Sequence, residues 1–144
     1  MKLKSKNPND IEIGQEIPPF KAKIEKKVYG KYNRLIHEIN PLHFNLNYAK
    51  KLGFDNIVIA GNFLFSFITK WIIDWVVDIK LIKNITMQFG KPVYIDEEIV
   101  CKGKVVEIQN IGNKKIIICK YLVEKLSGET VMNGIINLIF IKNR

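Results

Sequence analysis

The sequence contains few cysteines and histidines, and this shortage excludes several classes of protein. Only two cysteines occur in 144 residues, Cys101 and Cys119, and neither lies in a CxxC or Cys/His spacing. The pattern predicts neither a disulfide-stapled secreted fold nor a zinc site. We expect both thiols to be small core side chains in a reducing cytoplasm, and we expect no metal and no cofactor.

The chain also lacks an uninterrupted apolar run long enough to span a bilayer. Residues 1–10 are polar and charged, so no signal peptide is expected there. The most apolar stretch, residues 57–82, contains Lys70, Asp74 and Asp78. Charges near the middle of a spanning helix are costly, so this stretch predicts a buried helix and no membrane association.

Acidic residues are outnumbered by basic ones, 14 against 23, which gives a net charge of +9. Such a charge attracts polyanions, for example a phosphate-bearing cofactor, an acidic carrier protein or nucleic acid. A lysine-rich surface that is merely solvated explains the same excess. Because the lysines are scattered singly and in pairs, without interleaved aromatics, the pattern argues against nucleic-acid binding.

The chain has the length of one domain, which we take as residues 1–144, and it shows neither linker nor repeat. Local patterning predicts a strand and short helices, then one long helix, then strands rich in isoleucine and valine. The expected elements are a turn over 14–20, a strand over 21–27, helices over 28–37 and from Asn45 or Asn47 to Leu52, the long helix after Gly61, and strands within 85–109 (divided near 92–97), 114–126 and 130–142.

The long helix is predicted to be buried on all sides except for one narrow polar stripe. Its polar residues recur every fourth position, and nearly all the others are large and apolar; the stripe consists of Asn62, Ser66, Lys70, Asp74 and Asp78. We therefore predict an α+β fold in which an antiparallel sheet wraps around a long central helix. An open sheet edge would remain, which favours a symmetric dimer.

The most unusual polar cluster surrounds a rigid Asn-Pro turn between residues 37 and 43. Glu38 and His43 flank the turn, and Asn40 begins it. Histidine titrates near neutrality, and a nearby carboxylate can orient it or share its proton transfers, so the pair suits acid–base catalysis. A solvated glutamate and a surface histidine around an ordinary turn fit the spacing too.

A second candidate is the start of the long helix, at Gly61 and Asn62. Backbone N–H groups at a helix N-terminus are unsatisfied and can polarise a carbonyl on which negative charge develops. Glycine would let a substrate approach the backbone closely. A glycine that simply turns the chain is the alternative.

Three segments of the chain resemble, in order and spacing, the motifs of the MaoC-like hydratases. Residues 40–44 read Asn-Pro-Leu-His-Phe, residues 59–61 read Ile-Ala-Gly, and residues 89–93 read Phe-Gly-Lys-Pro-Val. The family pattern is Ser-Gly-Asp-x-Asn-Pro-Ile-His, then Ile-Ala-His-Gly-Met, then Phe-x-x-Pro-Val-x-x-Gly-Asp. The resemblance spans about residues 14 to 140 and implies a hot-dog fold.

The resemblance also implies a lyase activity, the hydration of enoyl thioesters to (R)-3-hydroxyacyl thioesters or the reverse. The substrate would be an acyl-CoA or an acyl group on a carrier protein. His43 and Asn40 match the family histidine and asparagine, and Gly61, with Asn62 after it, matches the turn that binds the thioester carbonyl. His43 and Glu38 would do the acid–base work with support from Asn40, in a homodimer or a heterodimer with another hot-dog subunit.

Three positions depart from the family pattern. Glu38 stands in place of Asp, His37 in place of the preceding Gly, and Ala60 in place of the His before the second Gly. Non-catalytic subunits of paired dehydratases carry altered motifs of this kind. Three other readings therefore stay open: an acyl-thioester-binding subunit that pairs with a catalytic homologue, a thioesterase of the same fold and a basic nucleic-acid binder.

Overall fold

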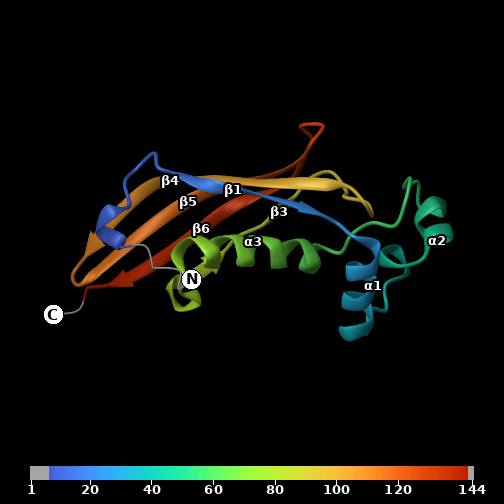
Figure 1. The fold of residues 1–144 in the computed structure, drawn as a ribbon, viewed down its shortest axis with the longest axis horizontal. Helices are drawn as coiled ribbons and strands as arrows, with labels where there is room; N and C mark the ends of the chain where they lie inside the picture. Colours follow the sequence, from blue (N-terminus) through green and yellow to red (C-terminus); the bar gives the residue numbers. More distant parts are fainter. Residues whose placement is uncertain (1–6, 143–144) are drawn as a thin grey trace.

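A six-stranded antiparallel sheet lies along one side of a long helix, α3, in the computed structural model, which describes residues 7–142 (Figure 1). The strand order is β1-β4-β5-β6-β2, and the short β3 also pairs with β6. The elements are η1 (Pro8–Asp10), β1 (Glu16–Lys23), α1 (Lys26–Leu35), η2 (Pro41–His43), α2 (Leu46–Lys51), α3 (Gly61–Val76), η3 (Ile79–Leu81), β2 (Ile82–Ile85), β3 (Gln88–Phe89), β4 (Glu98–Ile111), β5 (Lys114–Lys125) and β6 (Thr130–Ile141).

The predicted α+β architecture and the order of its elements are confirmed. Strand β5 shows the alternation that the sequence indicated, because Ile117, Cys119 and Val123 are fully buried against the helix while Lys120 is exposed on the opposite face. The capped helix after residue 45 is also present, and the Asn45 side chain accepts a hydrogen bond from the Tyr48 amide. Alternation and capping are local features, which explains why the sequence predicts them well.

The turn predicted over residues 14–20 is wrong for most of its length. Residues 16–23 form β1, and its Pro18-Pro19 pair lies inside the strand. The pairing with β4 shifts register between Ile17 and Phe20, and β1 is an edge strand. Proline is tolerated there because the missing N–H faces no partner strand. The strand expected over 21–27 accordingly ends earlier, at Lys23.

The predicted polar stripe is confirmed within α3, because the exposed residues of the helix are Asn62, Ser66, Lys70 and Asp74, but the remaining residues are not all fully buried as expected. Seven of its residues are buried: Phe63, Leu64, Ile68, Trp71, Ile72, Trp75 and Val76. Phe65, Phe67 and Ile73 remain partly exposed, and Asp78 lies beyond the helix, where it caps η3. The sheet covers one face of α3, and α1 and α2 lie beyond one end of the sheet (Figure 1).

Both cysteines lie in the core with free thiols, as predicted. Burial raises the pKa of the Cys101 thiol and of the Cys119 thiol to about 12. The thiols are therefore protonated at neutral pH and behave as small apolar groups. Of the helices within residues 7–142, none has the length and apolar character needed to cross a membrane.

Candidate active site

The loop between α1 and α2 holds Glu38, Asn40 and His43 in one tight arrangement. The Glu38 carboxylate accepts a hydrogen bond from the Asn40 amide at 2.9 Å, and the Asn40 side-chain oxygen accepts one from the Leu42 amide at 3.1 Å. Asn40 thereby caps η2, whose last residue is His43. The cap makes Asn40 a support for the loop, and one Glu38 carboxylate oxygen stays free of the turn.

His37 adopts a left-handed backbone conformation, with φ of 52°. This is the position where the MaoC-like motif has glycine, the residue that takes positive φ without strain. The loop therefore keeps the backbone shape that the glycine would give, and histidine is one of the non-glycine residues found there more often than most.

The His43 ring is oriented by the chain segment that leads into α3. Its Nδ1 lies 2.8 Å from the backbone oxygen of Val58. A carbonyl oxygen only accepts hydrogen bonds, so a neutral ring that makes this contact carries its proton on Nδ1. The lone pair then lies on Nε2, which is the arrangement required of a general base.

The start of α3 presents backbone N–H groups, as the sequence suggested. The amides of Gly61 and Asn62 have no hydrogen-bond acceptor within the described residues, as expected for a first helical turn. A Cβ on Gly61 would lie 2.5 Å from Cζ of Phe89, so in this chain the glycine makes room for an aromatic ring. The Phe89 side chain itself is 55% exposed.

Two residues on one face of α1 connect these parts, and sequence reasoning missed both. The buried Tyr29 hydroxyl accepts a hydrogen bond from the Ala60 amide at 2.9 Å, directly before α3. One helical turn later, the Asn33 side chain donates to the His43 backbone oxygen at 3.0 Å, and the Asn33 backbone oxygen accepts from the Glu38 amide at 2.9 Å. Their spacing of four residues, which places them on one helix face, was the available signal.

Aromatic packing fixes α1 against α3. The Phe63 ring lies 4.9 Å from the rings of both Tyr29 and Tyr32, centroid to centroid, and 5.3 Å from that of Phe67. Burial raises the pKa of Tyr29 above its ordinary value, so its hydroxyl stays protonated at neutral pH. The two halves of the candidate site are thus held by one packed aromatic cluster.

The structure brings Glu38 and His43 onto one loop and ties His43 to the segment that starts α3, but the two side chains make no hydrogen bond to each other within residues 7–142. Cavities of about 540 and 460 Å³ lie on the sheet around Lys120, and cavities of about 360 and 240 Å³ lie beside Glu98. None of these four is lined by Glu38, His43 or Gly61.

An antiparallel sheet laid along one central helix defines the hot-dog fold, and solved structures agree. The (R)-hydratase from A. caviae, described as involved in PHA biosynthesis, aligns with a TM-score of 0.78 at 17% identity over 90% of this chain and 96% of that one. One chain in the structure of the ChsH1-ChsH2 complex from Mycobacterium tuberculosis aligns with a TM-score of 0.75 at 19% identity, over 88% of this chain and 96% of that one.

The chain belongs to the MaoC-like domain family, whose model matches residues 9–125. A relative, the mitochondrial 3-hydroxyacyl-[acyl-carrier-protein] dehydratase FERN of Solanum lycopersicum, is 30% identical over 130 residues, which cover 90% of this chain and 78% of the relative. The resemblance and the hot-dog fold predicted from the sequence are confirmed. A second relative, from Arabidopsis thaliana, is also named as a mitochondrial 3-hydroxyacyl-[acyl-carrier-protein] dehydratase and is 30% identical over 86 residues, which cover 60% of this chain and 51% of the relative.

Proposed function

We propose that this protein adds water to enoyl thioesters, or removes it from (R)-3-hydroxyacyl thioesters, with His43 and Glu38 as the acid–base pair. The observation that carries the proposal is the 2.8 Å contact between His43 Nδ1 and the Val58 oxygen, because it leaves Nε2 as a proton acceptor. In hydration, the water oxygen bonds to the β-carbon, one water proton passes to the pair, and a proton returns to the α-carbon.

The start of α3 would supply the second requirement of this reaction. Negative charge develops on the thioester oxygen as the water adds, and the unsatisfied amides of Gly61 and Asn62 are suited to stabilise it. For this to happen, the Phe89 ring must swing aside from Gly61 when substrate binds. The partial exposure of Phe89 is compatible with such a movement.

A second hot-dog subunit would complete the pocket. Phe65 lies one helical turn after Gly61 on α3 and is partly exposed, and the edge strand β3 ends at the exposed Phe89, which lies against Gly61. Apolar surface and an open strand edge on one side of a chain favour a partner that covers both. We propose a homodimer, with the substrate on CoA or on a carrier protein. The cytoplasmic location remains a prediction, since the Solanum lycopersicum relative is described as mitochondrial.

The alternative is a non-catalytic subunit that binds the acyl thioester beside a catalytic homologue. Two observations favour it: Glu38 uses one carboxylate oxygen to close its own loop, and Phe89 covers Gly61. The ChsH1-ChsH2 neighbour, a complex of two proteins, provides a precedent for pairing.

The test is turnover of crotonyl-CoA and of a crotonyl carrier protein, followed by the loss of enoyl absorbance. We expect His43→Ala and Glu38→Gln to lower kcat by roughly 100-fold or more, which is the usual contribution of a general acid or base. His37→Gly is the matched control, because it removes the neighbouring histidine and retains the loop shape; we expect it to keep activity. Turnover that persists in His43→Ala would refute the assigned roles. No turnover alone, together with co-purification of a second hot-dog protein, would favour the alternative.

A further inference from the structure

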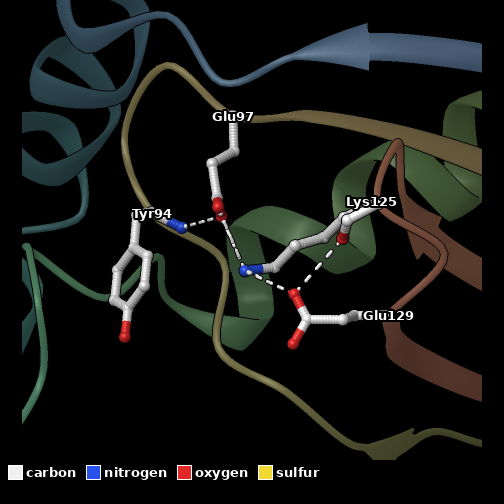
Figure 2. Close-up of polar contacts among 5 residues, drawn as sticks. Tyr94, Glu97, Lys125 and Glu129 are labelled. Carbon is white, nitrogen blue, oxygen red and sulfur yellow. Dashed lines mark hydrogen bonds and ion pairs between the residues drawn. The ribbon is translucent and has the colours of Figure 1, made fainter.

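A buried cation lies at the end of β5, away from the candidate catalytic side chains. The Lys125 side chain is only 10% exposed, and a buried ammonium group is costly unless it is paired. Its Nζ lies 2.9 Å and 3.1 Å from the two carboxylate oxygens of Glu97 and 4.0 Å from the Glu129 carboxylate. It also lies 5.1 Å from the centre of the Tyr94 ring, a cation–π contact (Figure 2).

Glu97 also closes the turn that precedes β4. Its carboxylate accepts a hydrogen bond from the Tyr94 amide at 2.8 Å, while the Glu97 amide donates to the Tyr94 oxygen at 3.3 Å. Inside this turn Asp96 takes a left-handed conformation, with φ of 66°. A strained turn needs contacts that hold it, and the Lys125–Glu97 ion pair supplies them from the neighbouring strand.

The segment that enters this turn pairs directly with the segment that supports His43. Val58 and Tyr94 form an antiparallel bridge, and the Ile59 amide donates to the Val93 oxygen at 2.8 Å. The Val58 oxygen is the group that orients His43 Nδ1, and Ile59 lies two residues before Gly61. One short stretch of backbone pairing therefore supports both the histidine and the helix start.

We propose that Lys125 is a positioning residue for this site. It acts through Glu97 and Tyr94 to hold the Val58–Ala60 segment, which keeps the His43 ring in its Nδ1–H tautomer and aims the first amides of α3. The proposal rests on the function proposed above, and it adds a residue that touches neither substrate nor reacting atoms.

A neighbouring ion pair provides the matched control. Lys102 and Glu124 also join β4 to β5, with 2.7 Å between Nζ and the carboxylate, but Lys102 is largely exposed. Within residues 7–142 neither side chain makes a hydrogen bond or an ion pair with the turn at residues 94–97 or with the Val58 segment. Removal of the Lys102–Glu124 ion pair therefore shows how much kcat and the His43 tautomer change when the sheet is merely less stable.

The experiment compares Lys125→Met, Lys125→Arg, Glu97→Gln and Lys102→Met in the intact protein. Two readouts are used: steady-state kinetics with crotonyl-CoA or the crotonyl carrier, and the ¹⁵N NMR signals of the His43 ring. We expect Lys125→Met to lower kcat by about 10- to 100-fold, the effect of a small displacement of catalytic groups, with little change in KM. In Lys125→Met the Nδ1–H tautomer of His43 should also lose population. Lys125→Arg should retain most of the parental kcat and of the parental tautomer population. Lys102→Met should match the parent protein in both measurements.

The outcomes separate the two proposals. Folded Lys125→Met with parental kcat and an unchanged His43 tautomer would overturn the positioning role, and so would an equal loss in Lys102→Met. If Lys125→Met does not fold, Glu97→Gln decides, because its amide oxygen still caps Tyr94 while the charge pair is lost; unchanged His43 signals would then overturn the role. If the parent protein turns over no thioester, the proposed function fails, but the NMR comparison still tests the Lys125–His43 connection.

Discussion

Replacement of Tyr29 by phenylalanine removes the hydroxyl that joins α1 to the start of α3 and that also interacts with the Asn33 side chain. The Tyr29 hydroxyl accepts the Ala60 N–H at 2.9 Å, and the two residues are 1% and 2% exposed. The substitution removes the acceptor and keeps the aromatic ring, so the packing against Phe63 at 4.9 Å is retained. The Ala60 amide is left buried without a partner.

The expected loss of stability follows from this geometry. An unsatisfied buried donor costs about 1–3 kcal/mol, and a retained ring adds no large cavity. For a chain of this size, 1 kcal/mol corresponds to roughly 2–4 °C in Tm, so Tyr29→Phe should unfold several degrees earlier than the parent. Because Ala60 directly precedes Gly61, we also expect a lower kcat with crotonyl thioesters.

The assay is urea denaturation followed by circular dichroism, with Tyr32→Phe as the control. Tyr32 packs against the same Phe63 ring, but its hydroxyl makes no hydrogen bond within the part of the chain that the structure describes. Tyr32→Phe should change the free energy of unfolding by less than about 0.5 kcal/mol, as expected away from a buried polar contact. Equal losses in the two variants, or no loss in Tyr29→Phe, would refute the reasoning.

Three further predictions concern strain, packing and burial. His37→Gly should stabilise the protein by roughly 1 kcal/mol in thermal unfolding, since φ of 52° is strained for histidine; a lower Tm would contradict this. Gly134→Ala should destabilise by about 1–3 kcal/mol, because its Cβ would lie 2.0 Å from the backbone oxygen of Thr86; parental stability would count against the close approach. Burial raises the pKa of Cys101 and Cys119 from 9.0 to about 12, so the folded state keeps protons that the unfolded chain releases. The free energy of unfolding should be independent of these thiols below pH 9 and fall as the pH rises from 9 towards 12; a thiol that reacts rapidly with iodoacetamide in the folded protein at pH 8 would show that its burial is wrong.

Much of the fold was determined by short-range patterns in the sequence. The two-residue period of β5 and the Asn45 cap each depend on residues a few positions apart, so they are visible without a structure. The candidate loop was also found from sequence, because Glu38, Asn40 and His43 lie within six consecutive residues and match a family motif.

Tertiary structure alone decided the rest, since those features depend on residues far apart in the chain. Pro18 and Pro19 lie within a strand because the residues on either side of them, Ile17 and Phe20, pair with β4 at the edge of the sheet. Which residues of α3 are fully buried and which stay partly exposed depends on how the sheet packs against the helix. Tyr29 reaches Ala60, and Lys125 reaches Glu97, only when separate elements have packed together. Such contacts leave no periodic trace in the sequence, because they are specified by packing geometry and not by local conformational preference.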